Sequence, residues 1–330
     1  MIPVESNGRY RERIWESHLA ADFERDVLAG LRAPQKAIPS KYLYDALGSA
    51  LFEAIVLLPE YDLPRRERAL LQQHATRIVE KIGKPPHLLE LGGGSSEKTR
   101  MLLEAAIAQF GSVRYTTIDI SLEAVRTAAA QLLDTYPQIT VDALVGDYFQ
   151  VLADVEPRSA TLALFLGSNL GNYPGRRGSD LFAAIYAALT PGDMFLLGVD
   201  LRKERAAMEL AYNDSLGVTA AFSKNVLARI NRELGAEIEL ANFCYASSFD
   251  EATGSIEAYL IAERSATYAL GAGRESIDVV AGERVHIESS HKFTREEVRA
   301  IGEECGFMER EFLTDDDNAF ALILLERSQR

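Results

Sequence analysis

The sequence has 330 residues, with 35 lysines and arginines against 49 aspartates and glutamates, and its formal net charge at pH 7 is −14. This length allows a sizeable core in one large domain or two interleaved ones, and the negative charge argues against a nucleic-acid partner. The chain has 2 cysteines, 5 histidines without an H-x-x-x-H pair, and no apolar run approaching ~18 residues, which argues against a disulfide framework, a metal site and a membrane segment. We therefore expect a cytoplasmic protein without a metal, and its oligomeric state stays open, with a monomer among the alternatives.

The first sixty residues do not have the pattern of a standard α/β sheet. Residues 10–31 predict an amphipathic helix, and residues 40–61 are rich in aromatic and small side chains. For each tyrosine of that segment, core packing and a place in a pocket wall remain open alternatives. Pro64 is typical of a helix start, and we expect that helix to run to Ile82 and to lead into the first strand of a sheet.

Strands and helices alternate from His87 to Asp200, which predicts a βαβα arrangement. The strands are expected at 87–91, 113–119, 139–145, 161–167 and 193–199, and the helices at 97–109, 121–135 and 177–189. After Asp200 the pattern changes to a helical stretch at 203–234, a strand hairpin at 242–249 and 254–263, a strand ending at 286–290, a helix at 294–305, and strands at 309–314 and 319–326. An insertion with strands of its own therefore interrupts the sheet.

The most informative stretch runs from His87 to Leu103. A short apolar run ends in Glu90, the glycines at 92–94 follow, and a helix starts after them. Such a turn lies at the carboxyl edge of a doubly wound sheet, where the ligands of these folds bind.

The spacing of this turn indicates which ligand it suits. A dinucleotide fingerprint beginning at Gly92 would need a glycine where the chain has Glu97, and the phosphate-loop pattern is absent. A glycine turn without a phosphate cradle suits a cofactor that has an adenosine but no phosphates. The sequence therefore predicts S-adenosylmethionine.

Two further strand ends carry carboxylates. Asp119 ends the run at 115–120, and we expect it to bind the two ribose hydroxyls of the adenosine. Asp147 follows the run at 141–145, where it can accept a hydrogen bond from the adenine amino group while Tyr148 packs on the ring. Each carboxylate alone is more simply a solvated turn or a helix cap. Three of them after three successive β-like runs favour cofactor binding.

These features predict an α/β fold, with a class I, Rossmann-like methyltransferase sheet and a second, α+β substrate-binding domain. A final antiparallel hairpin on a parallel sheet is how sheets of that class end. We assign residues 61–200 and 286–330 to the cofactor-binding domain, and residues 1–60 and 201–285 to the substrate-binding domain.

The fourth strand end, at 165–174, carries two asparagines, Asn169 and Asn172, in a segment rich in turn-forming residues. A side-chain amide can accept a hydrogen bond from an amine, which suits N-methylation. Methyltransferases that act on DNA amino groups have a Pro-Pro pair at this strand end, and it is absent here. With the negative net charge, this indicates a small amine as substrate, although an Asx turn would explain one of the two asparagines.

At this point the chain resembles a known family over nearly its whole length, the histidine-specific Nα-methyltransferases of ergothioneine biosynthesis, which convert L-histidine to its trimethylated betaine, hercynine. The stretches that carry the resemblance are KYLYDALGSALFEAIVLLPEY, LLELGGGSSEKTR, FLGSNLGNYP, AYNDSLGVTAAFSKNVLARINRELGA and IESSHKF. The last two are not general methyltransferase motifs, so the resemblance is specific. It implies S-adenosylmethionine-dependent methylation of the α-amino group of histidine.

The resemblance also implies site residues. The cofactor would be bound by Gly92, Gly94, Lys98, Asp119, Asp147 and Tyr148. Asn172 and Tyr44 would hold the amine in line with the methyl group, Tyr212 would bind the carboxylate, Tyr61 would line the pocket, and Glu288 and Ser290 would read the imidazole.

One position departs from the family pattern, because Ala258 stands where members of the family have a methionine that lines the imidazole site. The smaller side chain enlarges the pocket unless a neighbour fills it. A methyltransferase for another aromatic or imidazole-bearing amino acid or amine is therefore an alternative. Glu288 opposes it, since a buried carboxylate needs a ring N–H as partner. A binding protein that has lost the chemistry is a further alternative, disfavoured by the presence of Asn172 and Tyr212.

Overall fold

The structure is a computed structural model, and it describes residues 2–6, 8–15, 19–158, 160–173, 175–270 and 275–328. The chain divides into two compact units, each built from segments far apart in the sequence. Unit 1 consists of Met1–Ser17, Leu63–Arg202 and Phe293–Arg330, and unit 2 consists of His18–Asp62 and Lys203–Lys292.

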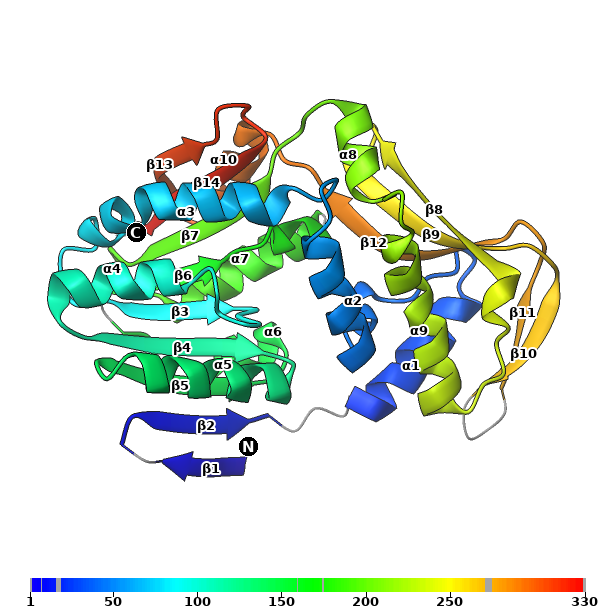
Figure 1. Ribbon diagram of the computed structural model, residues 1–330, viewed down its shortest axis with the longest axis horizontal. Helices are drawn as coiled ribbons and strands as arrows, with labels where there is room; N and C mark the ends of the chain where they lie inside the picture. Colours follow the sequence, from blue (N-terminus) through cyan, green and yellow to red (C-terminus); the bar gives the residue numbers. More distant parts are fainter. Residues whose placement is uncertain are drawn as a thin grey trace. The chain divides into compact units, whose positions relative to one another are not determined.

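Unit 1 contains a nine-stranded sheet with the order β1-β2-β5-β4-β3-β6-β7-β14-β13 (Figure 1). Its strands are β1 (Ile2–Ser6), β2 (Tyr10–Ile14), β3 (His87–Leu91), β4 (Val113–Asp119), β5 (Ile139–Val145), β6 (Thr161–Phe165), β7 (Met194–Asp200), β13 (Phe307–Thr314) and β14 (Phe320–Arg327). The strands from β2 to β7 are parallel, and β14 and β13 close the sheet as an antiparallel pair. This confirms the predicted class I methyltransferase sheet.

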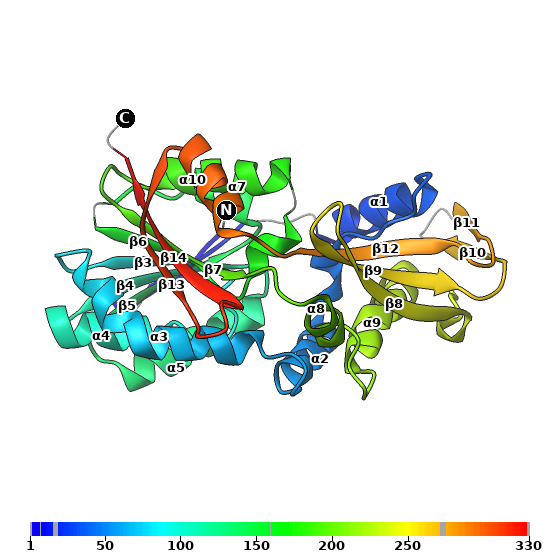
Figure 2. The ribbon, with the colours of Figure 1, turned by 90° about the horizontal axis from the view of Figure 1, so that it is seen from above.

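Helices cover both faces of this sheet. Figure 2 shows α3 (Leu63–Glu80), α4 (Arg100–Phe110) and α5 (Leu122–Thr135) on one face, and α7 (Arg176–Ala188) and α10 (Arg295–Glu304) on the other. The short helix α6 (Tyr148–Ala153) packs against α7. Since both faces are covered, the central strands are mainly apolar, and every residue of β3, β6 and β7 is buried.

The strand order places a topological switch beside β3. The chain builds β3, β4 and β5 in one direction and then crosses back to place β6 on the other side of β3. Ligands of doubly wound sheets bind outside the carboxyl ends of the strands at such a point. The turn after β3 and the loop after β6, which includes the short helix η2 (Asn169–Asn172), therefore share the edge where a ligand is expected.

Unit 2 is an α+β unit. Its three-stranded antiparallel sheet has the order β12-β9-β8, and β10 pairs with β11 in a separate ribbon. Figure 2 shows α9 along one face of the three-stranded sheet. The elements are α1 (Leu19–Arg32), η1 (Ser40–Leu43), α2 (Ala46–Val56), α8 (Arg205–Ala211), α9 (Val218–Leu234), η3 (Leu240–Asn242), β8 (Phe243–Asp250), β9 (Ser255–Ala262), β10 (Ala266–Leu270), β11 (Glu275–Val279) and β12 (Arg284–His291).

The helix predicted over residues 10–31 is wrong at its start, where residues 10–14 form β2. Tyr10 and Ile14 pack against an apolar cluster that includes Val125. Glu12, between them on the same strand face, accepts two hydrogen bonds of 2.8 Å from Arg126. Because alternate residues share one buried face, a strand satisfies this segment better than a helix. Residues 1–17 consequently belong to unit 1, not to the second domain as predicted.

The second domain boundary also needs correction, because residues 286–292 belong to unit 2. They lie in or directly after β12, which pairs with β9 rather than with the large sheet. The helical stretch predicted over 203–234 is two helices. Asp214 accepts hydrogen bonds of 2.8 Å from the N–H groups of Val218 and Thr219, and Gly217 has a φ of 73°. These features start a new helix. The ribbon of β10 and β11 was not anticipated.

Candidate active site

The glycine turn after β3 is closely packed on one side and open on the other. Gly92 and Gly94 have φ values of 72° and 50°, in the region that favours glycine. A Cβ atom on Gly92 would lie 2.5 Å from the hydroxyl oxygen of Tyr148, so a larger residue there would have to displace that side chain as well as strain the backbone. A Cβ atom on Gly94 would meet no described atom within 4 Å. The backbone at Gly94 is therefore accessible to a ligand.

Asp119 lies at the end of β4, beside this turn. One of its carboxylate oxygens accepts a hydrogen bond from the Gly94 N–H at 3.1 Å, and the other accepts one from the Ser121 N–H at 2.9 Å. Burial raises the pKa of Asp119, and the backbone N–H groups oppose that shift. Each oxygen retains acceptor capacity for a ligand hydroxyl. The geometry fits the predicted contact with the ribose.

Glu90, at the end of β3, packs beneath the glycine turn in the protein interior. It is buried and accepts hydrogen bonds from the hydroxyls of Thr99 and Tyr115. Burial raises the pKa of Glu90 to about 7. Its contacts connect the end of β3 to the start of α4 and to β4, which makes Glu90 an anchor of the turn.

Lys98 forms an ion pair with Glu67 of α3, a carboxylate with no exposed surface. The other oxygen of Glu67 accepts a hydrogen bond from the Gly167 N–H, in the loop after β6, at 2.7 Å. A Cβ atom on Gly198 would lie 2.1 Å from that oxygen, so the carboxylate is tightly enclosed. Glu67 thus ties the glycine turn to the loop after β6.

Asp147 and Tyr148 begin α6. Asp147 is exposed and caps the helix, because its carboxylate accepts a hydrogen bond from the Phe149 N–H at 3.0 Å. The ring of Tyr148 lies edge-on to Phe165, with 5.9 Å between the centroids. The contacts of both side chains with the adenine remain predictions.

The two asparagines after β6 differ in their contacts. The side-chain amide of Asn169 donates to the backbone carbonyl of Leu166 at 3.0 Å, which is a local turn contact. Asn172 is half-buried at the end of η2, and its side chain makes no hydrogen bond to the part of the chain that the structure describes. Asn172 is therefore the better candidate for a substrate ligand.

In unit 2, five aromatic rings form a continuous cluster. Tyr44 lies 5.5 Å from Phe52 and 5.3 Å from Phe222, measured between ring centroids. Phe52 lies 6.2 Å from Tyr61, which lies 6.1 Å from Tyr212. Most of these pairs are edge-to-face, the arrangement that the ring quadrupoles favour. The predicted tyrosines of this unit are brought together by the fold.

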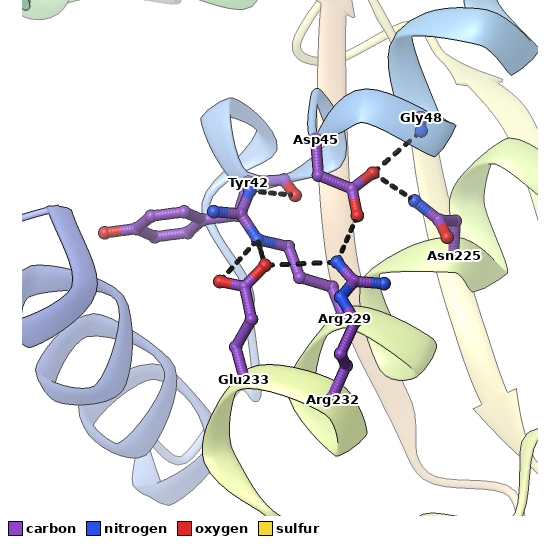
Figure 3. A network of polar contacts seen from close by, with 7 residues as sticks. All are labelled: Tyr42, Asp45, Gly48, Asn225, Arg229, Arg232 and Glu233. Atoms are coloured by element: carbon purple, nitrogen blue, oxygen red, sulfur yellow. Dashed lines mark hydrogen bonds and ion pairs between the residues drawn. The ribbon is translucent and has the colours of Figure 1, made fainter.

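A polar network fixes the backbone on both sides of Tyr44 (Figure 3). Arg229 of α9 donates to the backbone carbonyl of Tyr42 at 3.1 Å, and Arg232 of the same helix forms an ion pair of 2.5 Å with Asp45. Asp45 also caps α2. The network further includes Gly48, Asn225 and Glu233. Tyr44 thus lies between Tyr42, two residues before it, and Asp45, directly after it, and both of these are anchored to α9.

The three-stranded sheet presents a row of site residues on one face. Glu288 on β12 lies opposite Ala258 on β9, which lies opposite Ser247 on β8. Ser290 is on the same face of β12 as Glu288, because it is two residues further along the strand. The predicted imidazole-reading pair and the small residue beside it therefore share one surface.

Glu288 is a half-buried carboxylate on this face. Burial raises its pKa to about 7, and the positive charge of Lys292 opposes that shift. Its side chain makes no hydrogen bond with the described residues. A half-buried acceptor in this state is available to a ligand that supplies a donor.

Tyr212 and Ser290 meet Lys292. Their hydroxyl oxygens are 2.7 Å apart, and the Lys292 ammonium donates to Tyr212 at 2.8 Å and to Ser290 at 2.9 Å. The backbone carbonyl of Tyr212 accepts a hydrogen bond of 2.8 Å from the hydroxyl of Tyr245. These contacts fix the position of Tyr212 through both its side chain and its backbone.

A comparison with protein families decides the assignment. The model of one family, described as histidine-specific, S-adenosylmethionine-dependent methyltransferases, matches residues 23–327. The chain belongs to this family.

Two mycobacterial proteins with similar sequences carry the name histidine N-alpha-methyltransferase. The protein of Mycolicibacterium smegmatis is 38% identical over 316 residues, which cover 94% of this chain and 98% of the relative. The protein of Mycobacterium tuberculosis is 36% identical over 308 residues, covering 93% and 95%. Ergothioneine biosynthesis protein 1 of Schizosaccharomyces pombe is 29% identical over 281 residues, covering 82% of this chain and 36% of that protein.

The sequence analysis did not identify Glu67 and Lys292, two residues that contact predicted site residues. A signal was present for each. Glu67 interrupts the apolar face of α3, where it lies between Leu63 and Leu70 and is buried with them. Lys292 continues the alternation of Glu288 and Ser290 along one strand face, and it stands within the stretch IESSHKF.

Within the described ranges no group of three or more histidine, cysteine, aspartate or glutamate side chains is arranged to hold a metal ion. No helix of the described residues is long and apolar enough to cross a membrane.

Proposed function

We propose that this chain transfers methyl groups from S-adenosylmethionine to the α-amino group of L-histidine, three times in succession, to give hercynine. Membership of the family and the two mycobacterial relatives support this assignment. The observation that carries it is Glu288, a half-buried carboxylate that makes no hydrogen bond to the described residues, on the same strand face as Ser290. We further propose that the reaction takes place in the cytoplasm, needs no metal and involves no nucleic acid.

The residues around the glycine turn fit the cofactor. When bound, S-adenosylmethionine supplies a methyl group on a positively charged sulfur. We assign the open backbone at Gly94 and the carboxylate of Asp119 to its adenosine portion, because Asp119 is already oriented by two N–H groups. Lys98, oriented by Glu67, is assigned to the same site. Gly92, Asp147 and Tyr148 complete the proposed set.

Each methyl transfer to a neutral amine forms a nitrogen–carbon bond, breaks the sulfur–methyl bond and leaves S-adenosylhomocysteine as a neutral thioether. The product is a cation, which after the first and second transfers must lose a proton to solvent before the nitrogen can attack again, and the proposed roles follow from this. Asn172 accepts a hydrogen bond from the amine through its side-chain oxygen, and Tyr44 holds the amine in line for attack. Tyr61 lines the pocket, and Tyr212 binds the carboxylate of the substrate. As methyl groups accumulate, the ammonium enlarges, and aromatic faces tolerate it through cation–π attraction. No covalent intermediate with the protein is needed.

The imidazole is proposed to bind between Glu288 and Ser290. Glu288 accepts the hydrogen of one ring nitrogen, and Ser290 contacts the other nitrogen. A site built to bond a polar ring strongly rejects a ring that lacks the group, because the buried carboxylate is then left unpaired. This requirement favours histidine over amino acids with an apolar ring.

A second candidate is a methyltransferase for another aromatic or imidazole-bearing amino acid or amine. Ala258 favours it, because this small, buried residue lies directly opposite Glu288 on the site face. A larger ring would gain room at that position.

One experiment separates the candidates. The purified protein is incubated with S-adenosylmethionine and each of the twenty amino acids, and the products are measured by mass spectrometry, with and without a chelator. We expect turnover of histidine alone, unaffected by the chelator. Turnover of another amino acid, with histidine and its mono- and dimethylated forms unreactive, would contradict the proposal.

A further inference from the structure

Trp15, the one tryptophan of the sequence, follows the end of β2 and is buried. Its backbone N–H donates to the carbonyl of Val145 at 2.9 Å, so it continues the pairing of β2 with β5 (Figure 1). Its indole N–H donates to a carboxylate oxygen of Asp154 at 2.7 Å, and the Arg13 guanidinium lies 5.4 Å from the ring centroid. A backbone bond, a side-chain bond and a cation–π contact therefore fix the orientation of the indole.

Trp15 packs against the segment that leads from β5 into α6. A Cβ atom on Gly146, the residue after β5, would lie 3.1 Å from the Cβ of Trp15 and 2.9 Å from a methyl carbon of Val151 in α6. Gly146 is therefore closely enclosed between the tryptophan and the helix. The Gly146 N–H donates to the carbonyl of Asp119 at 2.9 Å, so this segment also connects the ends of β4 and β5. Trp15 thus lies directly behind the edge that carries two of the predicted cofactor carboxylates.

The position of α6 depends on its neighbours, because the helix has only 6 residues. Isolated helices shorter than about 12–15 residues are marginal in water, so a helix this short is stabilised by tertiary contacts. Asp154 is the C-cap of α6, and its bond to the indole therefore anchors the helix at its carboxyl end. Asp147 and Tyr148, which are assigned to the adenine, lie at the other end of the same helix.

The orientation of α6 determines what these two residues can reach. Asp147 accepts the Phe149 N–H with Oδ1, while its Oδ2 makes no hydrogen bond to the described residues. The hydroxyl oxygen of Tyr148 lies 2.5 Å from the position of a Cβ atom on Gly92, so the first turn of α6 meets the glycine turn. A rotation of α6 would therefore move both the carboxylate and the ring of the predicted adenine site.

We propose that Trp15 is a positioning residue of the cofactor site, which through Asp154 fixes α6 in the orientation that lets Asp147 recognise the adenine amino group. This inference rests on the proposed function, because it presupposes that S-adenosylmethionine binds at the ends of β3, β4 and β5. Trp15 precedes residues 23–327, the part of the chain that the family model matches, so its role is argued from the contacts of this structure. The hairpin of β1 and β2 thereby joins the elements that determine cofactor specificity.

The test measures recognition of the adenine amino group, which a merely structural role would not change. Two ligands are compared by calorimetry, S-adenosylhomocysteine and its analogue in which a hydrogen replaces that amino group. The readout is the ratio of their dissociation constants. Because the analogue lacks the donor for Asp147, the unaltered protein should bind S-adenosylhomocysteine roughly tenfold more tightly than the analogue.

The variants break one bond from its two sides. Trp15→Phe retains an aromatic ring and loses the indole N–H, and Asp154→Ala removes the acceptor. We expect each change to reduce the ratio roughly threefold or more, and the double change to reduce it no further. Asp154→Asn should retain most of the ratio, because an amide oxygen still accepts. Asp134→Ala is the matched control and should leave the ratio unchanged, since Asp134 is exposed near the carboxyl end of α5 and makes no hydrogen bond to the described residues.

Fluorescence shows whether a variant has changed the intended contact. Tryptophan emission reports Trp15 alone, so the spectrum of Asp154→Ala should shift and that of Asp134→Ala should not. An unshifted spectrum of Asp154→Ala, or a shifted spectrum with an unchanged ratio, would overturn the inference. Should Trp15→Phe not fold, Asp154→Ala decides the question, because Asp154 is exposed.

The outcomes separate the inference from the proposed function. Variants that lose affinity equally for both ligands, with the ratio unchanged, would show that Trp15 has only a structural role. Equal affinities for the two ligands in the unaltered protein, with histidine still methylated, would overturn the inference together with the assignment of Asp147. A protein that does not bind S-adenosylhomocysteine at all would instead contradict the proposed function.

Discussion

Glu288 is the residue whose removal should separate substrate binding from stability. Its side chain makes no hydrogen bond within the described ranges, and burial raises its pKa to about 7. Glu288→Ala therefore breaks no hydrogen bond within those ranges and removes a half-buried carboxylate whose charge is disfavoured there. We expect thermal stability to stay the same or to rise, while histidine loses its charged hydrogen-bond partner.

The magnitude follows from the type of bond that is lost. A hydrogen bond to a charged group contributes about 1.5–3 kcal/mol. At about 1.4 kcal/mol for each factor of ten, kcat/KM for histidine should fall roughly 10- to 150-fold. The loss should occur mainly in KM, and the affinity for S-adenosylmethionine, measured by calorimetry, should not change.

Glu257 offers a matched control in the same sheet. It neighbours Ala258 on β9, so its side chain is on the opposite face from Glu288. It accepts hydrogen bonds of 2.7 Å from His286 and from Ser289. Glu257→Ala should lower stability and leave the KM for histidine near its original value. An unchanged kcat/KM for histidine in Glu288→Ala would refute the assignment of the imidazole site.

Four further predictions concern other parts of the account. Asp119→Ala should weaken S-adenosylmethionine binding by ~1–3 kcal/mol in calorimetry, because ribose hydrogen bonds are lost; unchanged affinity would refute the ribose assignment. Glu67→Gln should lower cofactor affinity several-fold, since Lys98 loses the ionic partner that orients it, and an effect on stability alone would make Glu67 purely structural. The pKa of Glu288 is about 7 in the folded protein and about 4.3 in the unfolded chain, so its protonation stabilises the folded protein fully below about pH 4.3, and this contribution is lost as the pH rises to about 7. Denaturant titrations should show that the stability of the original protein, relative to that of Glu288→Gln, falls over this pH range. A stability difference that stays constant with pH would contradict the raised pKa. Ala258→Met should preserve histidine turnover and reduce turnover of larger rings in competition assays, whereas an equal loss for all rings would place Ala258 away from the ring.

Much of unit 1 could be predicted from the sequence because its signals are local. The apolar runs before Glu90, Asp119 and Asp147 are buried strands, and the structure places each of these residues at or directly after a strand end. The short strand β2 was predicted as helix, because YRERI has no apolar run and one of its two pairing partners, β5, is more than a hundred residues away. Local pattern does not show such a partner.

The candidate site likewise has local features, which the sequence predicts, and features that depend on long-range contacts, which it does not. The glycine turn is a local motif, whereas the positions of Tyr44 and Tyr212 depend on contacts between distant segments. Glu67 and Lys292 were missed because their roles come entirely from tertiary neighbours. Glu67 contacts the Gly167 N–H, 100 residues away, and Lys292 contacts Tyr212, 80 residues away. A buried charge inside an apolar or alternating pattern is the local trace of such contacts.

The central claim is that this chain methylates the α-nitrogen of histidine. The most direct measurement is tandem mass spectrometry of the product formed from L-histidine and S-adenosylmethionine by the purified protein, with the fragments locating each methyl group. The account predicts three methyl groups on the α-nitrogen and none on the ring. Methylation of a ring nitrogen, or no product from histidine, would contradict it.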